Sequence, residues 1–259
     1  MTLWLLGGHD PTHGAGLYRD LVTAKAIAPT LERRFAVTAL TTQGHGGPAE
    51  AVPVAAARLR RRVRSWPRPL AIKVGLVPDP LAQVVAQLVA DIGAPVVVDP
   101  VLRASDGGSL GASPEGLAPL LAVATVVTPN RDEARALVTG EDGGDLLIAL
   151  GQRFGSTAVL LKGGHESDPA TVTDRLIHGT TIARWSRPRI PGPDPRGTGC
   201  ALATAVAAGL ACGQRLESAV AAAVAWLDRA RIRWHRGCDG RAHLPDPTVA
   251  APARPGTAV

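Results

Sequence analysis

A short glycine-containing turn in the last third of the chain has the residue types of an anion-binding site. It comprises Gly197, Thr198, Gly199 and Cys200, and the alanine- and leucine-rich run that follows predicts a helix from about Thr198. Glycines permit a tight turn with positive φ, and the unpaired N–H groups at a helix start attract anions such as phosphate. A cysteine in the first helical turn lies where its thiolate is favoured. On these residues alone, the stretch is either an anion site or a glycine-rich loop before a packing helix.

Polar side chains follow several segments that have the character of strands. Residues 95–100 are the clearest of these, because their valine run is typical of a strand buried on both faces. Ligands of α/β sheets bind at the carboxyl ends of parallel strands, so polar residues at strand exits are candidates for chemistry. Taken singly, each is more simply a turn former or a helix cap. The exits carry Asp10, Gln43, Asp99, Asn130 and Lys162.

Predicted strands and helices alternate along the chain. Strands are predicted over residues 3–7, 35–42, 70–75, 95–100, 124–130 and 157–162, with an antiparallel hairpin over 172–178 and 181–185. Helices are predicted over residues 17–28, 49–65, 80–92, 114–123, 131–138 and 144–154, from about 198, and over 216–234. This alternation predicts an α/β fold with a mainly parallel central sheet and helices on both faces. We expect one domain over residues 1–244 and a disordered Pro/Ala-rich tail over 245–259.

The composition is that of a globular protein of the cytoplasm. Of the 259 residues, 46% are hydrophobic and 19% are charged, and the longest nearly apolar run is too short to cross a bilayer. The start of the chain has no basic leader before an apolar core, so it predicts a first strand and not a signal peptide. Three cysteines are an odd number without metal-binding spacing, which favours a reducing compartment.

The net charge of +6 raises the question of a nucleic-acid partner. Arginines concentrate in residues 58–64 and 229–236. No nucleic-acid-binding motif accompanies them, and 3% aromatic residues are too few for base-stacking platforms. We therefore favour solvated helix faces, whose positive field tolerates an anionic substrate such as a nucleotide.

The segments that carry these residues resemble, in order along the chain, the hydroxymethylpyrimidine/phosphomethylpyrimidine kinases of thiamin biosynthesis, a branch of the ribokinase-like superfamily. The resemblance spans residues 3 to about 240, and its most specific part combines Asn-x-x-Glu at Asn130 with the Gly-Thr-Gly-Cys motif at Gly197. The matching stretches are residues 8–11 with 14–16 and Asp20, 38–43, 72–75, 97–101, 128–134, 161–165 and 197–200.

The resemblance implies a ribokinase-like fold and an enzyme that transfers phosphate from ATP to the alcohol of 4-amino-5-hydroxymethyl-2-methylpyrimidine. The monophosphate of this alcohol is a further acceptor in the family, and a homodimer is expected. Pyridoxal kinases share parts of the pattern, so a pyridoxal-type kinase is one alternative. A non-catalytic protein that binds a pyrimidine as a sensor is another.

The resemblance also implies roles for residues around the transferred phosphate. The turn Gly197, Thr198 and Gly199 holds the phosphoryl oxygens, and Cys200 accepts the hydroxyl proton; its alternative role is that of a small buried residue. Asn130 and Glu133 are the pair that organises Mg²⁺, and Asp99 helps to order the same metal water, although Asn130 and Glu133 also fit a simple helix start. Lys162 and Gly164 bind the nucleotide phosphates. The alternative for Lys162 is a solvated lysine without a ligand.

The expected pyrimidine pocket is formed by Gln43, Gly8, Asp20, Leu76 and Val101. The side-chain amide of Gln43 offers a donor and an acceptor to an aminopyrimidine edge, and Leu76 and Val101 are apolar walls. Asp20 is alternatively a surface acid on a helix. Two departures stand out: His9 replaces a serine, and Asp194-Pro195-Arg196 replaces Asn-Thr-His. Arg196 either contacts phosphate or is solvated.

Overall fold

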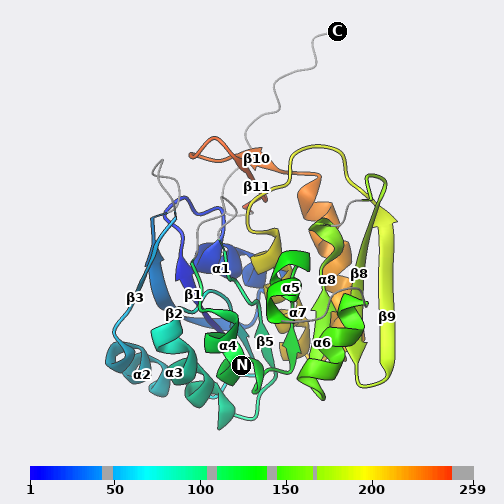
Figure 1. Ribbon diagram of the computed structural model, residues 1–259. Coiled ribbons are helices and arrows are strands. Elements are labelled where there is room, and N and C mark those ends of the chain that lie inside the picture. The colour runs from blue at the N-terminus through cyan, green and yellow to red at the C-terminus, as the bar shows by residue number, and fades with distance from the viewer. Residues whose placement is uncertain (43–48, 104–109, 139–144, 166–167, 247–259) are drawn as a thin grey trace.

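A nine-stranded sheet forms the centre of the described part of the chain (Figure 1). The computed structural model describes residues 1–42, 49–103, 110–138, 145–165 and 168–246. The strand order is β3-β2-β1-β4-β5-β6-β7-β8-β9. In chain order these strands are β1 (Thr2–His9), β2 (Glu32–Thr41), β3 (Ala51–Pro53), β4 (Ala71–Val74), β5 (Val96–Val98), β6 (Val126–Val127), β7 (Ala158–Leu161), β8 (Thr171–His178) and β9 (Thr181–Pro188).

The middle of the sheet is parallel and its edges are antiparallel. Strand β1 pairs in parallel with β2 and β4, and the parallel pairing continues through β5, β6 and β7. Strand β3 is antiparallel to β2, and β8 and β9 add an antiparallel hairpin to the other edge. The three valines of β5 are buried, as expected for a strand covered on both faces.

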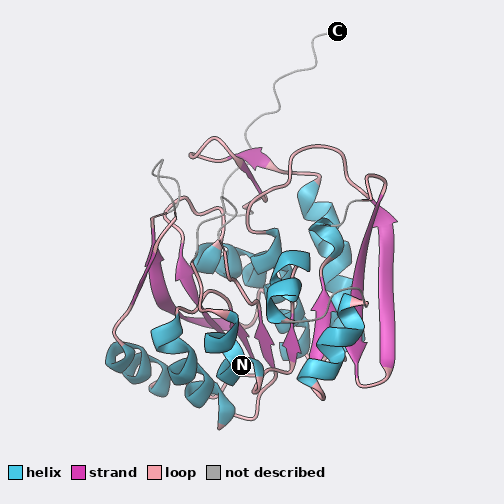
Figure 2. Cartoon of the chain, viewed as in Figure 1, coloured by secondary structure: helices cyan, strands magenta, loops and turns pink. Residues whose placement is uncertain are grey.

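Helices cover both faces of the sheet (Figure 2), which confirms the predicted α/β architecture. One apolar core packs the sheet against α2 to α6, and a second packs it against α1, α7 and α8. The helices are α1 (Gly16–Ile27), α2 (Ala56–Arg64), α3 (Asp79–Ala90), α4 (Pro114–Leu121), α5 (Arg131–Leu137), α6 (Leu146–Phe154), α7 (Thr198–Ala211) and α8 (Leu216–Arg231).

The strand order reverses direction at β1. From β1 the chain crosses to β2 on one side of it and then continues with β4 on the other side. In open α/β sheets such a reversal opens a crevice at the carboxyl ends of the two central strands, where ligands bind. The candidate site is therefore expected above the ends of β1 and β4.

The predicted helix over residues 49–65 is wrong in its first half. Residues 51–53 instead form β3, which pairs with Ala39 to Thr41 of β2, and the helix begins only at Ala56. Pro53 explains the difference, because proline lacks an N–H and disfavours a helical conformation in the residue before it. An edge strand tolerates such a residue. The other predicted elements are found with shifted ends.

A small hairpin that the sequence did not predict follows α8. Strands β10 (His235–Arg236) and β11 (Ala242–His243) pair antiparallel, and we call residues 235–246 the C-terminal hairpin. It lies over the carboxyl ends of the parallel strands in Figure 1. The prediction of a disordered tail from residue 245 is wrong at its start, because the carbonyl of Pro245 accepts a hydrogen bond from Arg19 and Asp246 is buried; residues 247–259 lie outside the described residues. No helix in the described ranges is long and apolar enough to span a membrane.

Candidate active site

The glycine turn lies at the start of α7, as the sequence predicted. Gly197 is the N-cap of the helix and has a φ of 77°, in the left-handed region that favours glycine. A Cβ at this position would lie 2.3 Å from the backbone oxygen of Gly14. Gly199 differs from the expectation, because it is helical and lacks a positive φ. Its missing side chain matters for space, since a Cβ there would lie 3.1 Å from Nζ of Lys162.

Three charged side chains from different strand exits meet beside this turn. Nζ of Lys162 lies 2.9 Å from Oδ1 of Asp99 and 3.6 Å from Oε2 of Glu133. Burial alone would lower the pKa of Lys162, but Asp99 and then Glu133 raise it above the ordinary value. The alternative of a solvated lysine is therefore wrong. Burial alone would raise the pKa of Asp99, but Lys162 and then Lys73 hold it below its usual range.

Asn130 and Glu133 form a capping box at the start of α5. Oδ1 of Asn130 accepts from the backbone N–H of Glu133 at 2.9 Å, and Oε2 of Glu133 accepts from the N–H of Asn130 at 2.7 Å. The helix-start interpretation of these residues is thus correct. It does not compete with a role in metal binding, because the same box fixes the Glu133 carboxylate toward Lys162 and Asp99. Burial raises the pKa of Glu133.

A buried ion pair supports the turn from below. Nζ of Lys73 on β4 donates to both carboxylate oxygens of Asp20 on α1, at 2.9 and 2.8 Å, and Oγ1 of Thr204 on α7 donates to the same carboxylate at 2.8 Å. Asp20 is fully buried, so the alternative of a surface acid is wrong. It lies beneath the site, and a direct contact with substrate stays a prediction from the resemblance. Burial alone would lower the pKa of Lys73, but Asp20 raises it.

We expect Lys73→Met to lower the free energy of unfolding by about 3–5 kcal/mol, because it leaves the Asp20 carboxylate buried without its partner. The double variant Asp20→Asn/Lys73→Met removes both charges and keeps the acceptor for Thr204, so it should regain most of that loss. Lys25→Met, at an exposed position of α1, is the matched control and should be near neutral. Urea unfolding followed by circular dichroism measures all three. A single variant as stable as the wild type would show that the pair contributes nothing.

Cys200 lies in the first turn of α7, above the buried pair. Burial raises the pKa of its thiol to about 12; Lys73 opposes this effect, whereas Asp20 and Asp99 add to it. The backbone N–H of Gly16 donates to the sulfur. The expectation that the helix start favours the thiolate is therefore wrong for the free protein, where removal from water outweighs the dipole. At neutral pH the residue is a thiol.

This raised pKa predicts selective alkylation. Only the thiolate reacts with iodoacetamide, so Cys200 should react far more slowly at pH 8 than the exposed Cys212 and Cys238. Its rate should rise roughly tenfold per pH unit toward pH 12, because each unit below the pKa lowers the thiolate fraction by that factor. Mass spectrometry of tryptic peptides measures the three rates separately. Fast labelling of Cys200 at pH 8 would contradict the raised pKa.

The apolar part of the expected substrate pocket is assembled at the strand-order reversal. A Cβ at Gly8, near the end of β1, would lie 2.5 Å from Cδ2 of Leu76, which follows β4. Leu76 belongs to a small apolar cluster against which Val101 packs. Gln43 lies outside the described residues, so its predicted contact with the pyrimidine stays a prediction.

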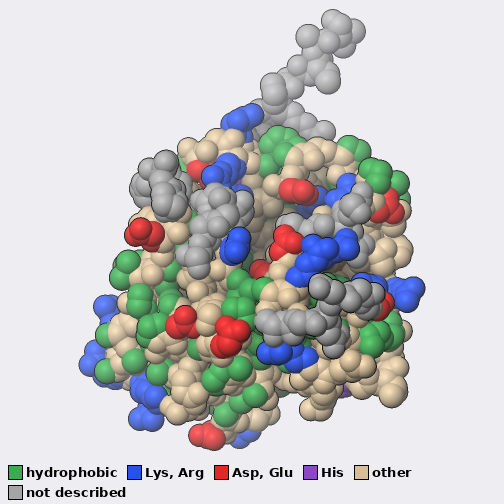
Figure 3. Space-filling model, viewed as in Figure 1, with side chains coloured by type: hydrophobic (Ala, Val, Ile, Leu, Met, Phe, Trp, Pro, Cys, Tyr) green, Lys and Arg blue, Asp and Glu red, His purple; other side chains and the backbone are tan. Residues whose placement is uncertain are grey.

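Gly164 follows β7 in a short 3-10 turn, two residues after Lys162, and its carbonyl accepts from Nη1 of Arg189 at 3.2 Å. Charged side chains of both signs are interspersed over the face of the molecule drawn in Figure 3. Nothing among the described residues forms a group of three or more side chains suited to hold a metal ion by themselves.

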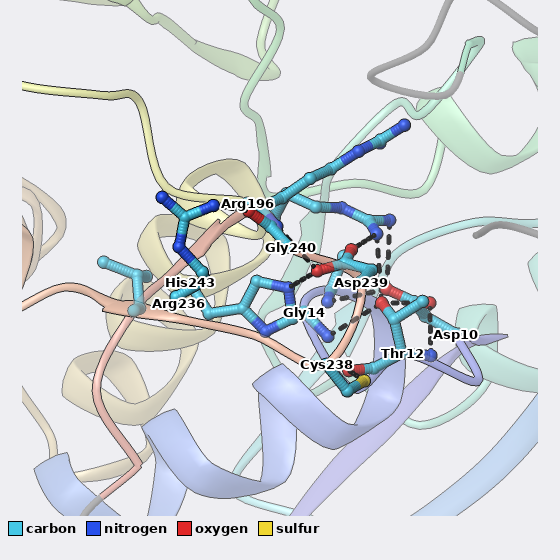
Figure 4. A network of polar contacts seen from close by, with 12 residues as sticks. Asp10, Thr12, Gly14, Arg196, Arg236, Cys238, Asp239, Gly240 and His243 are labelled. Atoms are coloured by element: carbon cyan, nitrogen blue, oxygen red, sulfur yellow. Dashed lines mark hydrogen bonds and ion pairs between the residues drawn. The ribbon is translucent and has the colours of Figure 1, made fainter. Parts of the chain in front are cut away.

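Arg196 is not solvated, so one of its two predicted alternatives is wrong, and contact with phosphate stays a prediction. It is buried, not solvated, and it is ion-paired to Asp10 at 3.1 Å and to Asp239 at 2.8 Å (Figure 4). Asp239 and His243 are the residues near the turn that sequence reasoning missed, because the hairpin that carries them has no strong strand pattern. A usable signal existed for Lys73, since a lysine within an apolar strand must find a buried partner.

Comparison with known proteins assigns the chain to a family. The family model described as phosphomethylpyrimidine kinase matches residues 10–244. A hydroxymethylpyrimidine/phosphomethylpyrimidine kinase of Streptomyces coelicolor is 40% identical over 229 residues, which cover 84% of each chain.

Solved structures agree with the fold. A phosphomethylpyrimidine kinase of Clostridium difficile superposes with a TM-score of 0.71 at 25% identity, covering 88% of this chain and 98% of the other. A pyridoxal kinase of Staphylococcus aureus in complex with ADP gives a TM-score of 0.80, also at 25% identity, and covers 94% and 92% of the two chains. The sheet, the turn at Gly197 and the match over almost the whole chain together place this protein in the phosphomethylpyrimidine kinase family, with a ribokinase-like fold.

Proposed function

We propose that this protein transfers the terminal phosphoryl group of ATP to the hydroxymethyl group of 4-amino-5-hydroxymethyl-2-methylpyrimidine. One observation carries the proposal: the open start of α7 at Gly197 lies beside Lys162, Asp99 and Glu133, at the carboxyl edge of the sheet. Phosphoryl transfer needs positioned charges and N–H donors more than it needs covalent chemistry. The family match supplies the substrate class.

In this proposal the backbone of Gly197, Thr198 and Gly199 binds the oxygens of the transferred group. These N–H groups start α7, where no earlier helical turn supplies carbonyl partners. Lys162 and Gly164 bind the nucleotide phosphates, and the ammonium of Lys162 neutralises part of their charge. The pyridoxal kinase of Staphylococcus aureus binds ADP on the same fold, which supports a nucleotide in this crevice.

The residues present fit Mg²⁺, which the family implies. The carboxylates of Asp99 and Glu133 both lie beside Nζ of Lys162, whose charge compensates theirs in the free protein. Mg²⁺ is usually bound by one or two carboxylates together with substrate phosphates and waters, so two carboxylates without a third side chain suffice. Asn130 keeps Glu133 in place through the capping box. When bound, the metal neutralises charge on the phosphates.

Cys200 is proposed as the group that accepts the hydroxyl proton. It lies in the first turn of the phosphate-binding helix and would accept the proton as the thiolate, a form that burial disfavours and the neighbouring Lys73 favours. Gly8, Leu76 and Val101 form the apolar wall for the pyrimidine, Gln43 pairs with its polar edge, and Asp20 holds Lys73 beneath Cys200. Phosphorylation of the monophosphate is a second step of the same proposal.

The alternative activity is that of a pyridoxal-type kinase, and one observation favours it: pyridoxal kinases superpose on the chain with TM-scores of about 0.8. Incubation with Mg·ATP and each alcohol, with products identified by mass spectrometry, separates the two. We expect the pyrimidine monophosphate to form. Phosphorylation of pyridoxal alone would establish the alternative, and binding of the pyrimidine without turnover would indicate a sensor.

The proposal includes a homodimer in the cytoplasm. The three free cysteines among the described residues suit a reducing compartment. Sedimentation velocity measures the oligomeric state directly.

A further inference from the structure

The guanidinium of Arg196 is buried where three separate parts of the chain converge beside the glycine turn (Figure 4). Its Nη2 donates to Oδ2 of Asp10 at 3.1 Å, and its Nη1 donates to Oδ2 of Asp239 at 2.8 Å. The same Nη1 donates to Oγ1 of Thr12 at 3.0 Å. The side chains of Arg196 and Asp239 are each only 5% exposed. Both terminal nitrogens therefore serve partners within the protein.

Asp10 shapes the loop that follows β1. Its Oδ1 accepts from the N–H and the hydroxyl of Thr12, at 2.9 and 2.8 Å, and its Oδ2 accepts from the N–H of Ala15 at 2.9 Å. The carboxylate that contacts Arg196 thus also fixes the loop. A Cβ at Gly14 would lie 3.3 Å from Cβ of Arg196, so the loop and the turn are packed closely.

The C-terminal hairpin, which supplies Asp239, has its own anchor on α1. Arg19 donates from Nη2 to the carbonyl of Leu244 and from Nη1 to the carbonyl of Pro245, each at 2.9 Å. Arg19 is buried, and its Cγ lies 3.0 Å from the place that a Cβ at Gly197 would take. The hairpin is therefore a fixed support against which the turn can be held.

We propose that Arg196 is a positioning residue. Through the ion pair of Arg196 with Asp239, the C-terminal hairpin helps to position the glycine turn of the active site. Arg196 holds the turn 197–199 at a set distance from the loop that Asp10 shapes. An arginine suits this task because its planar fork presents donors in two fixed directions, which the single ammonium of a lysine lacks. A phosphate clamp would instead require the guanidinium to leave two buried carboxylates, which is costly. The inference rests on the proposed phosphoryl transfer at this turn.

The test compares Arg196→Met, Asp239→Asn and the double variant of the full-length protein. We expect Arg196→Met to lower kcat about 100-fold and Asp239→Asn about tenfold, with little change in KM for ATP, because a misplaced turn slows transfer more than binding. The double variant should be no slower than Arg196→Met, because the Arg196–Asp239 ion pair is already broken in that single variant. Arg196→Lys should not restore kcat. The control Arg241→Met, at an exposed position of the hairpin, should stay within about twofold of wild type.

Hydrogen exchange tests this inference independently of the proposed function. The amides of residues 12–15 should exchange faster in Asp239→Asn than in the wild type or in Arg241→Met, whichever alcohol is phosphorylated. Wild-type kcat together with wild-type exchange in Asp239→Asn would overturn the inference. So would a raised KM for ATP at unchanged kcat in Arg196→Met, because that result assigns the guanidinium to substrate binding. If Arg196→Met does not fold, the kcat and the hydrogen exchange of Asp239→Asn decide whether the inference holds.

Discussion

Gly197→Val is expected to remove most of the phosphoryl-transfer activity from a protein that still folds. The residue has a φ of 77°, where a β-branched side chain is strained, and its new Cβ would lie 2.3 Å from the carbonyl oxygen of Gly14. The turn must therefore move away from the loop after β1, and the N–H groups it presents move with it. Loss of a single such donor costs on the order of 10²- to 10³-fold in kcat, and we expect a loss of at least that size.

Gly213→Val is the matched control for this prediction. Gly213 also has a positive φ, of 80°, but a Cβ there would meet nothing within 4 Å, and it lies beyond the far end of α7. The control therefore carries the same backbone strain, about 1–3 kcal/mol, without the clash and away from the site. It should lose stability and keep its kcat. Equal kcat values in the two variants would show that the turn is only a connector.

Cys200→Ala is expected to lower kcat by about 10²- to 10⁴-fold, the usual contribution of a positioned proton acceptor. The affinity for ATP, measured without the alcohol, should barely change, because the substitution removes a side chain and leaves the backbone donors of the turn. Burial raises the thiol pKa to about 12, so the rate of the wild type should increase with pH through the alkaline range, as the thiolate fraction grows.

Two further variants sharpen the test of Cys200. Cys212→Ala removes an exposed thiol at the other end of α7 and should leave kcat unchanged. Cys200→Ser keeps the size but presents a much weaker acid, so it should resemble Cys200→Ala. Near-normal turnover of Cys200→Ala would remove this residue from the mechanism.

The elements with strong local patterns could be predicted from the sequence. The valine run at residues 96–98 predicts a buried strand and the glycines before α7 predict a tight turn, and the structure has both where the sequence indicates. The first half of the predicted helix over residues 49–65 was wrong because the pairing of Ala51–Pro53 with β2 is a tertiary contact, which local propensity does not report.

Contacts between distant charges were the part that the sequence could not supply. Asp20 and Lys73 are separated by 53 residues, and Arg196 and Asp239 by 43, so no local pattern shows which partner each charge takes. The same limit applies to Cys200. Its place at a helix start favours the thiolate, but the burial that reverses this preference depends on β4 and α1, which pack beneath it.

One competition measurement tests the proposed activity most directly. The wild-type protein is given Mg·ATP and equal concentrations of 4-amino-5-hydroxymethyl-2-methylpyrimidine and pyridoxal in one vessel, and the two phosphorylated products are followed by mass spectrometry. The ratio of their initial rates is then the ratio of the two kcat/KM values. We predict that the pyrimidine product dominates by at least about tenfold, because a site with groups that pair with a substrate's polar edge discriminates against analogues that lack it. A ratio that favours pyridoxal, or no product from either alcohol, would contradict the proposed activity.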